Sequence, residues 1–177
     1  AGQTMDVSAD LEELARSNVA VVCAGVKSVL DIGKTLEYLE TKGVPVVGYQ
    51  TDELPAFYTR RSGFRADYRI ETPGEAALAM KTKWGLGLNG GIVIGNPVPM
   101  ESEIDRREID RVIDAAIAEM NEKAITGKDT TPFLLARIAE RTKGKSLATN
   151  IQLVLNNARV AAQIAMAYST LGDSGTS

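Results

Sequence analysis

The chain has 177 residues, of which 44% are hydrophobic and 24% are charged, and its formal net charge is −3 at pH 7. This is the composition of a globular protein of about one domain, and the absence of a basic block argues against a nucleic-acid polymer as partner. The sequence contains no histidine, which excludes histidine-dependent nucleophile pairs and histidine zinc sites within this chain.

The first helix is predicted to begin at Ser8, which is a good N-cap and precedes acidic residues in the first turn. Asp6, Ser8 and Asp10 place three oxygen-bearing side chains at this helix start. One interpretation is that these side chains cap the helix N-terminus. The alternative interpretation is an oxygen-rich site for a hard cation such as Mg²⁺ or Mn²⁺, which needs only one or two carboxylates plus water.

The run from Val19 to Cys23 predicts a fully buried parallel strand, and Ser28 is the expected N-cap of an amphipathic helix over about 29–41. Lys27 would then lie between a strand end and a helix start, where ligands of open α/β sheets collect. The helix start and partial burial would both lower the pKa of the Lys27 amine and make it a nucleophile. The alternative is a solvated surface lysine.

Cys23 is the only cysteine and lies inside this apolar strand, so we interpret it as a buried small residue. It cannot form an internal disulfide, which favours a reducing compartment. No apolar run reaches membrane-spanning length and no signal peptide is visible. We therefore expect a cytoplasmic protein without a membrane partner.

Further strands are predicted over 44–49, 68–70 and 92–94. Helices are predicted over 73–84, 105–123, 127–143 and 146–171, and Thr72 and Gly43 supply a helix cap and a helix stop. Strands alternating with helices predict an α/β fold, namely a three-layer α/β/α sandwich with a mainly parallel sheet. We expect a single domain over residues 1–171 and a disordered tail over 172–177.

Three arginines, Arg60, Arg61 and Arg65, lie beside aromatic residues in the segment 55–67. They could hold a phosphate or cover a pocket, and a solvated basic loop is the alternative. Asn96 follows the strand at 92–94, either as a turn former or as a hydrogen-bonding group in the cleft.

The last helix is expected to turn an apolar face inward, made of Leu147, Ile151, Val154, Leu155, Ala158 and Ala162. Asn150, Asn156 and Asn157 interrupt this pattern, and asparagine is a mediocre helix former. These amides indicate a lined cavity or an interface, with capping and solvent exposure as the alternative.

Several long segments, in the same order along the chain, resemble the pseudouridine-5′-phosphate glycosidase family, also called indigoidine synthase A-like. They include DVSADL at 6–11, VVCAGVKS at 21–28, LNGGIVIGNP at 88–97, GKDTTPFLL at 127–135 and TNIQLVLNN at 149–157. The resemblance covers essentially the whole chain and is more specific than any short motif.

The resemblance implies reversible cleavage of the C–C glycosidic bond of pseudouridine 5′-phosphate to uracil and ribose 5-phosphate, with Mn²⁺ as the divalent metal. It implies that Lys27 is the nucleophile, which joins C1′ of the opened sugar as an imine or a related adduct. It further implies that Asp6 is the metal ligand and that Ser8, Ala9 and Asp10 contact the substrate, with a hydrogen-bonding or acid–base role for Asp10. Asn150 resembles an amide that the family places in the same pocket.

The family's chains are much longer than this one, and their first part supplies a glutamate proton donor, a second lysine and a glycine-rich loop. We therefore expect a carboxyl-terminal piece whose missing amino-terminal part travels with it as another chain or segment. The resemblance also implies a homotrimer. Two alternatives stay open: another imine-forming phosphosugar lyase or aldolase, and a non-catalytic interaction module.

Overall fold

The computed structural model describes residues 9–26 and 31–172. Its centre is a sheet of four parallel strands in the order β1-β4-β2-β3. The strands are β1 (Ala20–Cys23), β2 (Val46–Tyr49), β3 (Tyr68–Ile70) and β4 (Ile92–Gly95). They agree with the four predicted strands to within one or two residues, because each is a short apolar or β-branched run between turn residues.

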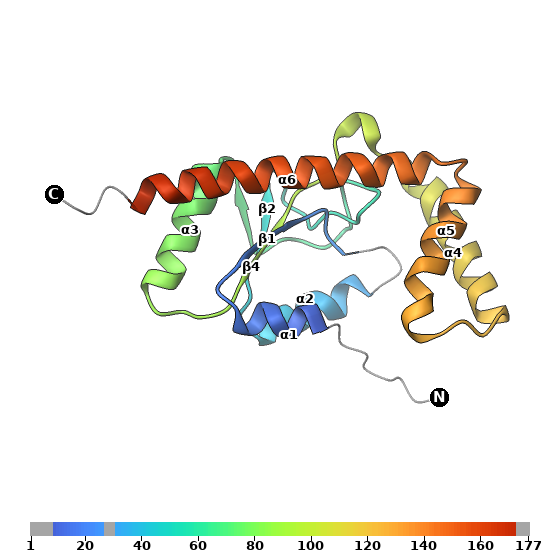
Figure 1. Ribbon diagram of the computed structural model, residues 1–177, viewed down its shortest axis with the longest axis horizontal. Coiled ribbons are helices and arrows are strands. Elements are labelled where there is room, and N and C mark those ends of the chain that lie inside the picture. The colour runs from blue at the N-terminus through green and yellow to red at the C-terminus, as the bar shows by residue number, and fades with distance from the viewer. Residues whose placement is uncertain (1–8, 27–30, 173–177) are drawn as a thin grey trace.

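Helices cover both faces of the sheet (Figure 1). On one face, α3 (Pro73–Gly85) and α6 (Lys145–Gly172) pack on the strands, with Val160 and Ile164 of α6 against Ile92 and Ile94 of β4. On the other face lie α1 (Ala9–Arg16) and α2 (Ile32–Thr41), which bury Leu39 against Val93. This arrangement confirms the predicted three-layer α/β/α sandwich with a parallel sheet.

A helical hairpin extends the molecule beyond one end of the sheet (Figure 1). It consists of α4 (Arg106–Glu122) and α5 (Thr130–Arg141), with the short 3₁₀ turns η1 (Met100–Ser102) and η2 (Gly127–Asp129) before each helix. The two helices share their own buried cluster, which includes Ile109, Ile113, Leu134 and Ile138. Within the described part of the chain, no helix is long and apolar enough to cross a membrane.

The helix ends follow local chemistry. The Thr72 hydroxyl accepts a hydrogen bond from the Glu75 backbone N–H and caps α3, and the Asp105 carboxylate caps α4 by accepting from the Glu108 N–H. Gly43 ends α2 with a φ of +68°, a conformation that suits glycine. These caps confirm the predicted boundaries of α3, α4 and the end of α2.

The start of α2 differs from the prediction. Asp31 is the N-cap, and its carboxylate accepts from the Lys34 N–H, so the helix begins at Ile32. Ser28 and the Lys27 position lie outside the described residues. An aspartate carries a full negative charge to the helix N-terminus and is favoured there. The predicted N-cap Ser28 is thus corrected to Asp31, while the position predicted for Lys27 stays a prediction.

Strand β1 is not fully buried, contrary to the prediction. It is an edge strand, paired only with β4, and Val21 remains 36% exposed. Cys23 is partly buried between the sheet and the α1–α2 layer. A run of valines specifies a strand well, but its place in the sheet depends on which partners the rest of the chain supplies.

The side of α6 that was expected to face the protein interior faces outward instead. Leu147, Ile151, Val154 and Leu155 are 52–56% exposed, whereas Leu153, Val160 and Ile164 face the sheet. Both sides of this helix are apolar, so the periodicity alone could not decide which of them packs inward. The polar residues Ser146 and Thr149 are buried near its start because they hydrogen-bond to Thr142 and to Ser102.

Candidate functional site

Three loops meet at one edge of the sheet, because β1, β2 and β4 are parallel and end there together. They begin at Ala24, Gln50 and Asn96. This is the edge at which open α/β proteins bind their ligands.

The chain leaving β1 is fixed to the loop after β2. The Phe57 N–H donates to the Ala24 carbonyl oxygen at 2.9 Å, and Gly25 forms an antiparallel bridge with Ala56. Gly25 has a φ of +85°, and a Cβ atom there would lie 1.6 Å from the Pro55 carbonyl oxygen. Only glycine fits. The direction of the chain two residues before Lys27 is thus set by backbone contacts.

Helix α6 crosses the same edge. Asn96 is 3% exposed and donates its amide to the Asn157 side-chain oxygen at 2.9 Å. Asn156 donates to the Pro97 carbonyl oxygen at 3.4 Å, and Leu153 packs with Ala24. Asn96 is therefore a hydrogen-bonding group at this edge, one of the two roles considered for it, and the asparagines of α6 face the strand ends.

Asn150 is half-buried and lies one turn before Leu153 and two turns before Asn157. Residues at this spacing share one side of a helix. The neighbouring Thr149 hydroxyl donates to the Ser102 carbonyl oxygen at 2.8 Å, which holds this turn of α6 beside the loop after β4. Asn150 is thus placed on the side of α6 that covers the strand ends, while its role stays a prediction.

The first turn of α1 points to the same edge. The Gly91 N–H donates to the Leu14 carbonyl oxygen at 2.7 Å, which places the end of α1 beside the start of β4. The helix is eight residues and about 12 Å long, so its start, with Ala9 and Asp10, lies toward the strand ends. Both residues are exposed. The predicted site residues Asp6, Ser8 and Lys27 lie outside the described residues.

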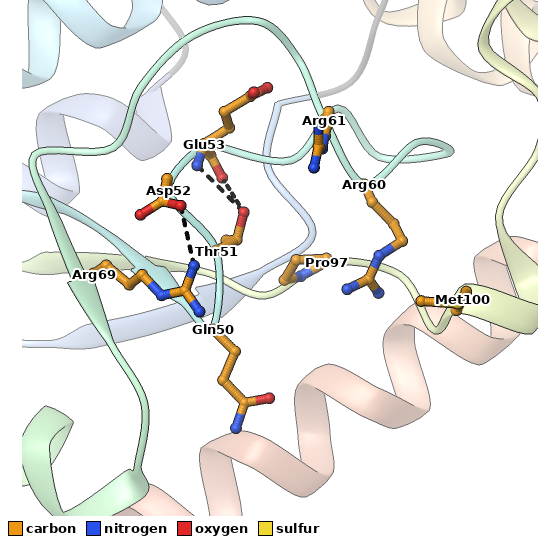
Figure 2. A pocket seen from close by; sticks show the side chains of 9 residues that line it. All are labelled: Gln50, Thr51, Asp52, Glu53, Arg60, Arg61, Arg69, Pro97 and Met100. Carbon is orange, nitrogen blue, oxygen red and sulfur yellow. Dashed lines mark hydrogen bonds and ion pairs between the residues drawn. The ribbon is translucent and has the colours of Figure 1, made fainter.

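An open pocket of about 410 Å³ lies at this edge (Figure 2). It is lined by Gln50, Thr51, Asp52, Glu53, Arg60, Arg61, Arg69, Pro97 and Met100. The Arg60 guanidinium points toward Pro97 and Met100, where it donates to the Val98 carbonyl oxygen at 2.7 Å. Among the described residues, no side-chain partner binds the Arg61 guanidinium. The pocket can therefore bind an anion such as a phosphate through Arg60 and Arg61.

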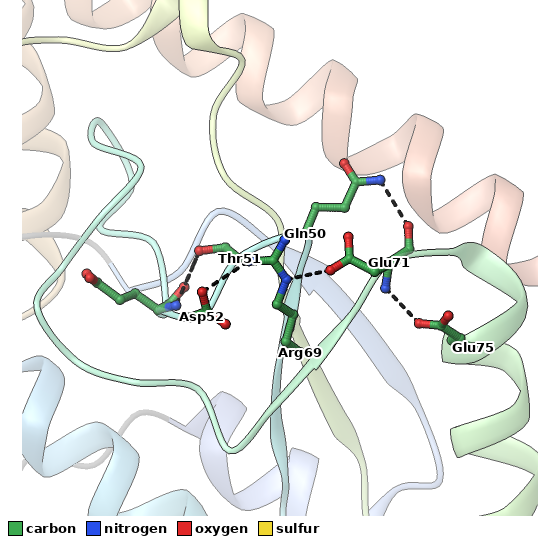
Figure 3. A network of polar contacts seen from close by, with 7 residues as sticks. Gln50, Thr51, Asp52, Arg69, Glu71 and Glu75 are labelled. Atoms are coloured by element: carbon green, nitrogen blue, oxygen red, sulfur yellow. Dashed lines mark hydrogen bonds and ion pairs between the residues drawn. The ribbon is translucent and has the colours of Figure 1, made fainter.

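Arg69 is already neutralised (Figure 3). Its guanidinium pairs with Glu71 at 2.5 Å and with Asp52 at 3.0 Å, and these carboxylates, Glu71 first, raise the pKa of Arg69. Gln50 donates to the Glu71 carbonyl oxygen at 3.0 Å, and Glu75 accepts from the Glu71 N–H at 2.7 Å. This network joins the loop after β2 to the start of α3. It braces the pocket wall, and among the described residues Arg60 and Arg61 are the pocket arginines without a salt bridge.

The thiol at the end of β1 is a poor nucleophile. Burial raises the pKa of Cys23, and a hydrogen bond from the Gly25 backbone only partly opposes this effect. The thiol is therefore protonated at neutral pH and unreactive. An amine from Lys27 remains the nucleophile predicted for this edge.

No group of three or more acidic or cysteine side chains able to hold a metal ion occurs within residues 9–26 and 31–172. The described carboxylate nearest in sequence to the predicted ligand Asp6 is that of Asp10. Two oxygen side chains with water suffice for Mn²⁺. The donor type therefore fits the metal, and the ligand set stays a prediction.

The parallel sheet and the polar strand ends define an α/β protein with a polar pocket at one edge of its sheet. Residues 1–167 match the sequence profile of the family described as indigoidine synthase A-like protein. The chain belongs to this family.

Curated relatives named pseudouridine-5′-phosphate glycosidase are much longer. The protein from Clostridium botulinum is 60% identical over 171 residues, which cover 97% of this chain and 56% of the relative. The protein from Geobacillus kaustophilus is 61% identical over 169 residues, which cover 96% of this chain and 56% of that relative. The chain thus spans a little over half the length of these relatives.

Two solved structures share the fold. The prealnumycin C-glycosynthase AlnA, in complex with ribulose 5-phosphate, superposes with a TM-score of 0.89 at 32% identity, covering 97% of this chain and 57% of that one. An indigoidine synthase A-like protein from Thermotoga maritima superposes with a TM-score of 0.82 at 38% identity, covering 91% and 53%.

The sequence indicated some parts of this edge and missed others. Arg60 and Arg61 were among the three arginines named, whereas Arg65 does not line the pocket. Gln50 begins a loop whose polar residues indicated this edge, whereas Arg69 carried no signal, because its role comes from the packing of β2 against β3. The close approach at Gly25 could have been suspected only from a glycine directly after a strand.

Proposed function

We propose that this chain is the lysine-bearing part of a pseudouridine-5′-phosphate glycosidase, which reversibly cleaves the C–C bond to give uracil and ribose 5-phosphate. The observation that carries this proposal is 60–61% identity, over at least 96% of the chain, to proteins with that name. The likeness to a C-glycosynthase solved with a pentulose phosphate supports a sugar phosphate as ligand.

The geometry is consistent with this chemistry. The exit of β1, the start of α1 and the asparagine-bearing side of α6 meet at one sheet edge, which supports the proposal that Asp10 and Asn150 share a site with the lysine that follows β1. A C–C glycosidic bond has no heteroatom leaving group to protonate. An imine between the Lys27 amine and C1′ of the opened sugar supplies an electrophilic carbon at which the bond to uracil forms or breaks.

The other residues receive supporting roles. Ser8, Ala9 and Asp10 would contact the sugar, Asp10 would donate or accept a hydrogen bond or a proton, and Asn150 would hydrogen-bond in the same pocket. Asp6 would bind Mn²⁺, which supplies a Lewis acid that orients and polarises oxygen groups. We place the activity in the cytoplasm, where the free thiol stays reduced.

The proposal includes the part of the relatives that this chain does not span, supplied as another polypeptide or segment, and assembly as a homotrimer. Light scattering of the purified complex tests the assembly, because a trimer has three times the mass of its unit. A monomeric active complex would contradict the trimer and leave the chemistry unaffected.

The imine can be trapped with borohydride. The chain is co-expressed with the unmatched part of the Clostridium botulinum relative, incubated with ribose 5-phosphate and Mn²⁺, reduced, and mapped by mass spectrometry. We expect a sugar adduct on Lys27 that disappears in Lys27→Arg and persists in Lys34→Arg, an exposed lysine of α2. An adduct of equal yield in Lys27→Arg would overturn the assignment.

Product analysis separates the alternatives. Uracil and ribose 5-phosphate should give pseudouridine 5′-phosphate, whereas an aldolase would trap the same imine and leave uracil unchanged. A non-catalytic module would give neither product nor adduct. Replacing Asp6 with Asn should raise the Mn²⁺ concentration needed for half-maximal activity, and an unchanged requirement would contradict its role as a ligand.

A further inference from the structure

One side of α6 exposes a line of large apolar residues. Leu147, Ile151, Val154 and Leu155 are each more than half exposed, and Met166, farther along, is 70% exposed. We call this surface the outer face of α6. Figure 1 shows α6 running along the length of the molecule above the sheet.

The outer face lies opposite the side that packs on the sheet. At about 100° per residue, Leu147, Ile151 and Val154 lie roughly 100–180° around the helix from Leu153 and Val160. The two sides are apolar along most of the 28-residue helix, which carries only two charged residues, Lys145 and Arg159. A helix that is apolar on two opposite sides normally lies between two packed layers.

Small residues continue the outer face toward the end of the helix. Ala158, Ala162 and Ala165 are exposed and lie on this side. Small side chains let the backbone of a neighbouring helix approach closely, while the larger residues at 147–155 supply area for burial. The helix is about 42 Å long, which is sufficient for several turns of a partner.

The length of the relatives indicates what covers this face. The 171 matched residues make up 56% of the Clostridium botulinum protein, which leaves about 130 residues without a counterpart in this chain. Those residues must pack on some surface of the shared fold, and a surface that is buried in the longer chain is exposed in the shorter one. A second copy of the chain is the other candidate occupant, and the oligomeric state of the variants distinguishes it.

We propose that the outer face of α6 is the docking surface for the part of the family chain, about 130 residues, that this chain does not span. The partner is a polypeptide that buries an apolar face on Ile151, Val154 and Leu155. This binding needs no substrate and does not depend on the proposed activity.

Co-expression tests this proposal. The tagged chain is produced together with the unmatched part of the Clostridium botulinum protein, and the molar ratio of the two in the purified material is measured. We expect a ratio near one for the original chain. Leu155→Glu should reduce the recovery of the partner at least about tenfold, because a charge in the centre of an interface removes a hot-spot contact.

Leu78→Glu is the matched control. Leu78 lies on α3 and is 56% exposed, against 54% for Leu155, so the two changes are alike in exposure and in chemistry. The control should retain the partner. Circular dichroism and thermal unfolding establish that both variants fold, since both positions are exposed.

Two results would overturn the proposal. The first would be that the partner is not recovered with the original chain. The second would be that the partner is recovered equally with Leu155→Glu and with Leu78→Glu. A third result would assign the outer face to a contact between copies of the chain. In that case Leu155→Glu leaves the recovery of the partner unchanged, but lowers the mass of the assembly from a multiple of 18.9 kDa to that of a single chain.

Discussion

Replacing Gly25 with alanine should destabilise the fold far more than the same change at Gly63. The two glycines have nearly the same backbone conformation, with φ of +85° and +87°. They differ in their surroundings, because an added Cβ would lie 1.6 Å from the Pro55 carbonyl oxygen at Gly25 and would meet nothing within 4 Å at Gly63. Comparing the two variants therefore separates the cost of a left-handed alanine backbone from the cost of the close contact with Pro55.

The magnitudes follow from this geometry. A left-handed alanine costs about 1–2 kcal/mol, and we expect that loss of unfolding free energy for Gly63→Ala. At Gly25 the Pro55 backbone must also move, which disrupts the 2.9 Å hydrogen bond from the Phe57 N–H to the Ala24 oxygen. Leaving such groups unpaired adds about 1–3 kcal/mol. The total for Gly25→Ala is about 2–5 kcal/mol.

Urea unfolding followed by circular dichroism measures both variants, with equal m-values as the condition for comparing them. Gly85→Ala is a further control, because Gly85 ends α3 without a positive φ and with nothing within 4 Å. It should be neutral or stabilising by up to about 1 kcal/mol. Equal losses for Gly25→Ala and Gly63→Ala would refute the role of the contact with Pro55.

Three further results are expected. Thr72→Ala should cost about 1 kcal/mol of unfolding free energy through loss of the α3 cap, and Thr72→Ser should restore most of it. Asn157→Leu should cost about 1–3 kcal/mol, because the buried Asn96 amide loses its acceptor, and no loss in urea unfolding would contradict that. Glu119 has its pKa lowered by hydrogen bonds from Lys123 and other cations. It therefore stabilises the fold above the ordinary glutamate pKa, and that stabilisation is lost as the pH falls through its lowered value. Thermal unfolding of Glu119→Gln should depend less on acid pH, and identical profiles would exclude this contribution.

The strands and several caps could be predicted because local chemistry determines them. Short apolar runs specified β1, β2 and β4, and Thr72 and Gly43 marked helix ends through their own hydrogen bonds and backbone preferences. These signals lie within a few residues of the feature that they predict.

The orientation of α6 and the edge position of β1 could not be predicted, because both depend on distant partners. The larger residues Leu147 and Leu155 lie outside, while Val160 and Ile164 face the sheet. Periodicity identifies an apolar side without saying what covers it.

The candidate site was predictable only in part. The sequence placed polar residues after the strands, and Asn96 and Asn157 do meet there. The pairing of Arg69 with Glu71 and Asp52 could not be foreseen, because it requires β3 beside β2. An arginine that is neutralised in this way looks the same in sequence as Arg61, whose guanidinium has no side-chain partner among the described residues.

The register of β1 also bears on how the chain is made. Ala20 pairs with Ile92, so among the described residues β1 has its sheet partner in a strand synthesised 72 positions later. At ribosomal rates of roughly 5–20 residues per second, β1 waits about 4–14 s for this neighbour. The strand that leads to Lys27 therefore pairs with β4 only after β2 and β3 have been synthesised.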